Sequence, residues 1–312
     1  MAACTMKDII HLVSVSGGKD STASLILALK QFPESTFAVF ADTGNEHEAT
    51  FDYLCNLEQT LGIRIKHVKA DFSGRFEHRR NYILSKWPEK GVPADRCERA
   101  AALLQPSGNP YLDLCMLKGR FPSRMRQFCT RELKVIPITE YALWFVDHLG
   151  ADVWSWQGVR RNESSERVNA KGFEDLSGGI YAFRPIAGWT AQQTVDFVRL
   201  HGVPLNPLYR LGQGRVGCMP CINTNKAALA EISRRFPGHI ERIAEWERIV
   251  ADVSRHGGAS FFPAPDDGRG ALRGRNIVDY VRWAQTLRGG RVHDPQWDEA
   301  APACASSYGL CE

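Results

Sequence analysis

Strand-like and helix-like segments alternate over the first part of the chain, and this alternation is the strongest constraint on the fold. The apolar runs at 9–15, 36–41 and 63–68 have the length of short buried strands. Between them, 21–31 and 46–61 carry apolar residues at helical spacing. Short strands joined by helices form parallel sheets with helices on both faces. The sequence therefore predicts an α/β fold of the Rossmann type with a twisted parallel sheet.

The alternation stops at about residue 87 and returns at about residue 132. Between them, 87–128 mixes proline, glycine and arginine and predicts a loop-rich insertion. We expect 1–222 to form the α/β domain and 223–312 to form a helical C-terminal region with a cysteine-containing tail. The remaining expected elements are a helix at 132–149, strands at 153–157 and 181–185, and helices at 192–201, 226–236, 238–256 and 277–287, with a glycine-rich linker at 257–274.

The first strand runs directly into a helix through the segment SGGKDS, Ser16 to Ser21. A helix start has unpaired backbone N–H groups and the positive end of the helix dipole, so it attracts phosphate. Gly17 and Gly18 let the main chain approach an anion closely, and Lys19 adds a full positive charge. The segment is not a Walker loop, because Val13 stands where that motif requires glycine. A tight surface turn is the alternative, but the flanking strand and helix favour a phosphate site.

Composition restricts the class of protein. The chain has 312 residues and a formal net charge of +4, and no apolar run approaches the roughly 20 residues of a membrane span. Its start lacks the pattern of a secretory signal, so we expect a cytoplasmic protein. Nine cysteines in a reducing compartment are expected to be thiols or metal ligands rather than disulfides. The clustered arginines suggest anionic ligands without requiring nucleic acid.

SGGKDS resembles the pyrophosphate-binding loop of the adenine nucleotide alpha-hydrolase (PP-loop) superfamily, whose members split ATP between the α and β phosphates. DTGNE (42–46), FCTRELKVIP (128–137), GVRRNESSER (158–167), RPIAGWT (184–190) and NPLYRLGQGRVGCMPCI (206–222) are similar, in order, to segments of phosphosulfate reductases. The resemblance implies a nucleotide site with Mg²⁺, in which Lys19, Asp20 and Ser21 are catalytic. The residues that it implies for nucleotide binding are Ser16, Gly17, Gly18, Lys19, Asp20, Ser21, Phe40, Ala41, Asp42, Thr43, Lys134, Gly158, Arg160, Arg161 and Arg167.

Lys19 distinguishes between activities within this family. A cation placed to neutralise a departing pyrophosphate suits ATP cleavage, whereas phosphosulfate reductases do not expel pyrophosphate. The closest type is then the ATP pyrophosphatases of DNA phosphorothioation, which would adenylate a DNA backbone oxygen and take sulfur from a cysteine desulfurase or another donor. The alternatives are a phosphoadenosine phosphosulfate or adenosine phosphosulfate reductase that makes sulfite, and a non-catalytic nucleotide-sensing subunit.

Cys218 and Cys221 form a C-x-x-C motif, which is weak evidence by itself. In the resembling reductases a cysteine at the position of Cys129 joins this pair in a [4Fe-4S] cluster. The fourth ligand is open: Cys115, Cys304 or Cys311 completes the cluster, or three cysteines leave one iron accessible. Zinc, or no metal, is the alternative. Cys304 and Cys311, in the tail that ends YGLCE, are also candidates for a mobile sulfur carrier, whereas Cys4, Cys55 and Cys97 have no supporting pattern.

The arginines near residue 160 suit phosphate or sulfate oxygens, because a guanidinium binds such groups through two parallel hydrogen bonds. An internal ion pair of Arg160 or Arg167 with Glu163 is the alternative. Two further groups of arginines are candidates for a nucleic-acid backbone track, namely Arg120, Arg124 and Arg126 and, near the end of the chain, Arg269, Arg273 and Arg275.

Overall fold

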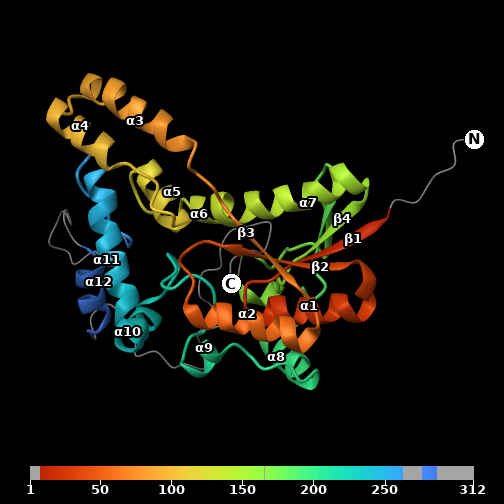
Figure 1. Cartoon of the computed structure of the whole chain (residues 1–312). Helices are drawn as coiled ribbons and strands as arrows, with labels where there is room; N and C mark the ends of the chain where they lie inside the picture. Colours follow the sequence, from red (N-terminus) through yellow and green to blue (C-terminus); the bar gives the residue numbers. More distant parts are fainter. Residues whose placement is uncertain (1–7, 165, 263–275, 287–312) are drawn as a thin grey trace, which may run out of the picture.

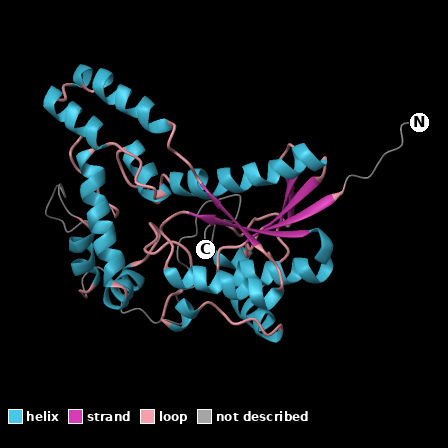
Figure 2. Cartoon of the chain, in the orientation of Figure 1, coloured by secondary structure: helices cyan, strands magenta, loops and turns pink. Residues whose placement is uncertain are grey.

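A six-stranded sheet forms the centre of one half of the molecule in this computed structural model, which describes residues 8–164, 166–262 and 276–286 (Figures 1 and 2). The strand order is β3-β2-β1-β4-β6-β5, and all neighbours are parallel except β5 and β6. The predicted α/β class is confirmed. The strands are β1 (Ile9–Ser14), β2 (Thr36–Asp42), β3 (Ile65–Lys69), β4 (Asp152–Trp156), β5 (Phe173–Asp175) and β6 (Ile180–Phe183).

The short edge strand β5 was not predicted, because its sequence FED is mostly exposed and has no apolar alternation. By contrast β1 lies between β2 and β4, and five of its six residues are buried. Val13 is in register with Ala38 of β2 and with Trp156 of β4. The carboxyl ends of these three strands therefore lie side by side, and the loops that follow them meet at one edge of the sheet.

Helices cover both faces of the sheet (Figure 1). On one face α1 (Lys19–Gln31), α2 (Glu48–Leu61) and α8 (Ala191–Leu200) share a core with β1 and β2. On the other lies α7 (Ile136–Leu149), which packs against β2 and β4. The helix predicted at 132–149 starts earlier than expected, because α6 (Phe128–Thr130) and a π-helical turn, η3 (Arg131–Val135), lead into α7.

The other half of the molecule is helical. Within 87–128, where a loop-rich insertion was predicted, 19 of the 42 residues form two helices, α4 (Ala94–Leu103) and α5 (Pro110–Lys118). Proline and glycine lie at the ends of these helices rather than inside them, as Pro93, Pro110 and Gly119 do. We also did not predict α3 (Arg75–Lys86), whose strongly charged sequence buries only Phe76 and Ile83.

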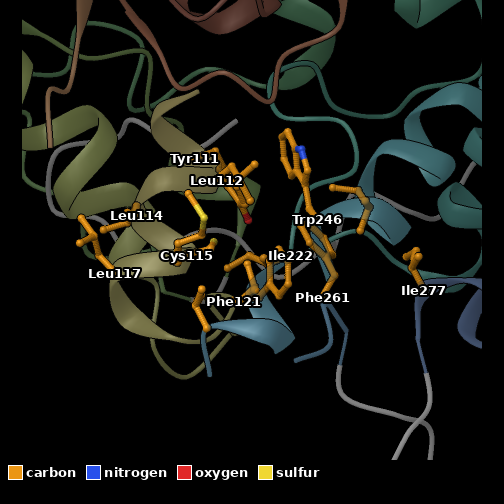
Figure 3. Packing of buried hydrophobic residues seen from close by; sticks show 14 of the residues in the cluster. Tyr111, Leu112, Leu114, Cys115, Leu117, Phe121, Ile222, Trp246, Phe261 and Ile277 are labelled. Atoms are coloured by element: carbon orange, nitrogen blue, oxygen red, sulfur yellow. The ribbon is translucent and has the colours of Figure 1, made fainter. Parts of the chain in front are cut away.

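The helices α3 to α5 share one hydrophobic core with the C-terminal helices α10 (Lys226–Arg235), α11 (Pro237–Asp252) and α12 (Ile277–Ala284). Figure 3 shows Leu114 and Cys115 of α5 in the same cluster as Trp246 of α11 and Ile277 of α12. The helical half is thus built from two stretches of chain on either side of α7. Short elements complete the structure: α9 (Pro207–Arg210) and the 3-10 turns η1 (Pro33–Ser35), η2 (Pro88–Lys90) and η4 (Arg161–Glu163). Among the described residues, no helix is long and apolar enough to cross a bilayer.

Candidate active site

The segment between β1 and α1 forms a preorganised loop. Gly17 has φ +83°, and a Cβ there would lie 2.8 Å from Cγ2 of Thr50, so the position requires glycine. The hydroxyl of Ser21 donates to the carbonyl of Gly18 at 3.0 Å and accepts from the backbone N–H of Ser16 at 3.1 Å. Gly18, at the N-cap, makes no side-chain capping bond. The loop therefore leads into the start of α1, where the first amide of the helix, that of Lys19, donates to the hydroxyl of Tyr209 at 3.0 Å.

A second loop, after β4, presses against this first one. A Cβ on Gly158 would lie 2.6 Å from the backbone nitrogen of Ser21, so only glycine fits there. Arg160 then reaches the buried carboxylate of Asp20, with Nε 2.7 Å from Oδ1, and Lys19 Nζ lies 3.6 Å from the other oxygen. Asp20, predicted to be catalytic, is thus engaged in an ion pair that fastens the β4 loop to the start of α1.

A pocket of about 450 Å³ opens beside this junction. Its lining includes six residues of the predicted nucleotide site, namely Ser16, Ser21, Phe40, Ala41, Lys134 and Gly158. It also includes five residues that were not predicted, Ser14, Val15, Glu46, Ile138 and Gly217. Six of the fifteen predicted residues therefore line one cavity at the carboxyl edge of the sheet, where open α/β sheets bind ligands, whereas Lys19 is not part of the lining.

Other predicted binding residues lie outside that lining. Arg161 donates from Nε to the carbonyl of Ala170, and Arg167 forms an ion pair with Glu163. The internal ion pair considered from sequence is thus present for Arg167, whereas Arg160 binds Asp20. In the β2–α2 loop, Asp42 accepts the backbone N–H of Gly44 at 2.9 Å. These side chains shape the loops around the pocket.

The three cysteines predicted as metal ligands line a neighbouring pocket of about 390 Å³. Cys129 comes from α6, and Cys218 and Cys221 come from the loop before α10. Burial, and then Cys221, raise the pKa of Cys129 to about 12, and burial also raises the pKa of Cys218. The thiols of Cys129 and Cys218 are therefore held protonated, and a metal would have to displace those protons. The other lining residues are Thr43, Tyr111, Gln127, Thr130, Leu133, Lys134, Ile222 and Asn223.

Lys134 lines both pockets. Burial alone would lower the pKa of its ammonium, but Cys218, Glu46 and the other cysteines of the pocket raise the pKa above its ordinary value. Lys134 thus carries a positive charge in the wall between the pocket beside the SGGKDS loop and the pocket lined by the three cysteines, which we call the cysteine pocket. An anion in either pocket would interact with the same ammonium group.

Three cysteines were candidates for the fourth cluster ligand, and of these the structure describes Cys115, whereas Cys304 and Cys311 lie outside the described residues. The predicted arginines Arg269, Arg273 and Arg275 also lie outside them. The thiol of Cys115 is buried in α5, and its pKa is raised by burial and then by Cys129. The pKa of Tyr111 is raised by burial and by four cysteines, Cys115, Cys129, Cys218 and Cys221. Tyr111 lines the cysteine pocket together with Cys129, Cys218 and Cys221.

Residues of the β2–α2 loop support the cysteine pocket, which no sequence motif indicated. The carboxylate of Glu46 accepts from the hydroxyl of Thr43 at 2.6 Å, and the Cys218 thiol lies 3.7 Å from the same oxygen. Asn45 donates from its amide to the carbonyl of Pro220 and accepts from Arg242. Only the fold brings residue 46 and residue 218 together, because no local pattern connects them.

Behind this loop His47, Glu48 and His239 have potential ligand atoms within 4.8 Å of one another, the one such group of three among the described residues. Nε2 of His239 is 3.4 Å from Glu48, while Nδ1 of His47 accepts the backbone N–H of Ala49 and caps α2. On its other side, the ring of His239 contacts the carbonyl of Met219 through Nδ1 at 3.2 Å. The group therefore connects the start of α2 to the C-x-x-C loop.

Comparison with known proteins places the chain in a family. The model of the phosphoadenosine phosphosulfate reductase domain matches residues 10–224. A 37.8 kDa protein of Escherichia phage 186, described as uncharacterized, is 43% identical over 332 aligned residues, which cover 99% of this chain and 98% of the phage protein. The adenosine 5'-phosphosulfate reductase of Allochromatium vinosum, an enzyme of sulfur metabolism, is 32% identical over 220 residues, 70% of each chain.

Among solved structures, a phosphoadenylyl-sulfate reductase from Candida auris is similar, with a TM-score of 0.42 and 16% identity, over 70% of this chain and 85% of that one. The family match covers more than half of the chain and includes both pockets. This chain is therefore a member of the phosphoadenosine phosphosulfate reductase domain family.

Proposed function

We propose that this protein is an ATP pyrophosphatase that adenylates an acceptor oxygen so that sulfur can replace it. The observation that carries the proposal is the arrangement of the two pockets. The nucleotide pocket at the SGGKDS loop and the cysteine pocket share the wall that contains Lys134. A nucleotide activated in the first pocket would lie next to sulfur chemistry in the second.

The first step transfers the adenylyl group. An oxygen of the acceptor attacks the α phosphorus of ATP, and the bond from that phosphorus to the bridging oxygen breaks, so that pyrophosphate leaves with the electron pair. The loop offers backbone N–H groups and Lys19 to the negative charge that accumulates on the departing group. Mg²⁺ would add further neutralisation. Hydrosulfide then attacks the activated acceptor, and AMP leaves with the electron pair of the broken bond, so this step needs no oxidant or reductant. If a desulfurase supplies the sulfur as a persulfide, a thiol reductant must first release it as hydrosulfide.

The cysteine pocket suits a [4Fe-4S] cluster better than zinc. Tetrahedral zinc with bonds of about 2.3 Å requires sulfur atoms about 3.8 Å apart. No three cysteine sulfurs of the described residues lie within 4.8 Å of one another, whereas a cubane binds each thiolate at a different corner. Cys129, Cys218 and Cys221, with Cys115 as the fourth, would hold the cluster. With four cysteines bound, every iron of the cluster has a protein ligand; with Cys129, Cys218 and Cys221 alone, the cluster would supply an open iron site for sulfur. In both cases Lys134 would balance part of its negative charge.

The acceptor that we favour is a DNA backbone phosphate, with a cysteine desulfurase or another donor as the sulfur source. Arg120, Arg124 and Arg126 support this choice, since they precede Gln127 and Cys129 of the cysteine pocket. Arg124 and Arg126 are exposed and flank Met125, which is 92% exposed. An exposed basic loop next to the pocket would contact a phosphate backbone without reading its sequence.

A second candidate function is reduction of adenosine phosphosulfate or phosphoadenosine phosphosulfate to sulfite. The identity of 32% with a named adenosine 5'-phosphosulfate reductase favours it. Lys19 favours ATP cleavage instead, because a reductase has no pyrophosphate to expel. The third alternative, a nucleotide-sensing subunit, would use the same pocket without turnover.

One experiment distinguishes the three. Anaerobically purified protein is incubated with ATP and Mg²⁺, or with either phosphosulfate plus reduced thioredoxin, and pyrophosphate and sulfite are measured. Pyrophosphate release supports the proposal, sulfite supports the reductase, and nucleotide binding with neither product supports the sensing subunit. Lys19→Ala should reduce pyrophosphate release at least 100-fold. Lys30→Ala, an exposed lysine at the other end of α1, is the matched control and should keep full activity.

A further inference from the structure

Tyr209 occupies the start of α1. Its hydroxyl, which comes from α9, accepts the backbone N–H of Lys19 at 3.0 Å. The ammonium of Lys19 also lies 5.4 Å from the centre of the Tyr209 ring, within cation–π range. The first amide of α1 and the lysine charge, both of which suit phosphate, are thus in contact with one tyrosine.

A further cavity, of about 540 Å³, lies against the same tyrosine. Its lining consists of Tyr209, two arginines, Arg199 and Arg210, and two apolar residues, Pro204 and Leu205. No acidic residue lines it, and neither arginine forms a hydrogen bond or ion pair through its side chain with any other described residue. Lys19 contacts Tyr209, which lines this cavity together with both arginines.

The segment that carries Tyr209 is fixed to the phosphate loop. Asn206 is buried, and its amide donates to the carbonyl of Gly17 at 3.3 Å. The side-chain oxygen of Asn206 also accepts the backbone N–H of Leu208, which caps α9. Tyr209 and Arg210 are therefore held in place beside the SGGKDS loop, and the cavity that they line lies next to this loop.

We propose that this cavity is a binding subsite for inorganic pyrophosphate, with Arg199 and Arg210 as its ligands and Tyr209 as the wall between it and the phosphate loop. The inference rests on the proposed function, which makes pyrophosphate a product released on the other side of that wall. Guanidinium groups bind phosphate oxygens through paired hydrogen bonds, and two of them match the two phosphoryl groups of pyrophosphate. The subsite receives the product as it leaves Lys19.

The test is direct binding of inorganic pyrophosphate to the full chain by calorimetry. We expect Arg199→Ala combined with Arg210→Ala to weaken pyrophosphate binding at least tenfold and to change AMP affinity less than twofold. The matched control is Arg234→Ala with Arg235→Ala on α10, which removes the same charge from an exposed surface. This control should bind pyrophosphate within twofold of the wild type.

Two outcomes overturn the subsite: the Arg199 and Arg210 double variant binds pyrophosphate as the wild type does, or the control weakens binding equally. Because binding needs no turnover, this result is independent of ATP cleavage. A protein that binds pyrophosphate through these arginines but does not cleave ATP would retain the subsite and refute the pyrophosphatase. A protein that cleaves ATP but binds pyrophosphate independently of these arginines would support the pyrophosphatase and refute the subsite.

Discussion

The two halves of the molecule build their sites in different ways. In the sheet half, the phosphate site consists largely of backbone: a strand end, two glycines and the start of α1. In the helical half, the cysteine pocket consists of side chains from α5, α6 and the loop before α10, which only packing brings together. A backbone site is contained in a few consecutive residues, whereas a side-chain site depends on the whole core beneath it.

The largest expected effect follows from this difference and concerns Cys115. If four thiols surround a cluster, then Cys115→Ser should remove most of the iron from anaerobically purified protein, because one corner of the cubane loses its ligand. Iron content and the visible absorption of the cluster are the measurements. Cys97→Ser replaces another buried cysteine of the same core and should keep the iron. Full iron content in Cys115→Ser would instead indicate three ligands or a ligand from the tail.

A substitution that creates a cavity can test whether the helices of the helical half share one core. Leu114→Ala in α5 removes a fully buried side chain and should lower the free energy of unfolding by about 2–5 kcal/mol. Hydrogen exchange should accelerate in α10 to α12 as well as in α4, since all belong to one cluster. Leu25→Ala in α1 is the counterpart in the sheet half and should accelerate exchange there. An effect of Leu114→Ala confined to α3 to α5 would mean that the two stretches fold separately.

The backbone character of the phosphate site predicts that a single methyl group disrupts it. Gly158→Ala places a Cβ 2.6 Å from the backbone nitrogen of Ser21, so one of the two loops must shift. We expect nucleotide binding to weaken about 100-fold, which corresponds to about 2.7 kcal/mol. Gly188→Ala has open space around its Cβ and is the control. Unchanged affinity in Gly158→Ala would show that the loop tolerates displacement.

The smallest effect concerns pH. Burial lowers the pKa of His11, whose Nδ1 accepts from the indole N–H of Trp156 at 3.0 Å. The folded state therefore resists protonation, while the unfolded chain takes up a proton near pH 6.5. Stability is retained above that pH and falls as the pH decreases below it. His11→Gln keeps a hydrogen-bond acceptor but does not titrate, so its unfolding free energy should vary less between pH 7 and pH 5. An identical slope in both proteins would contradict this assignment.

The same difference explains what could be predicted from sequence. Alternating strands and helices and the SGGKDS loop are local features, so β1, α1 and the lining formed by Ser16, Ser21 and Gly158 were recognisable. The helices α4 and α5 were not recognisable, because they are stabilised by burial against C-terminal helices about 130 residues further along the chain. Glu46 beside Cys218 and Tyr209 beside Lys19 were not recognisable for the same reason. Each contact is created by the fold and has no counterpart in the neighbouring sequence.

The position of Lys134 in the wall between two pockets has a consequence for how the protein could change over time. Any substitution that alters this lysine changes the electrostatic potential in both cavities at once, so nucleotide affinity and thiol chemistry cannot be adjusted separately at this residue. A change confined to one cavity must instead come from a residue that lines that cavity alone, such as Phe40 in the first or Tyr111 in the second.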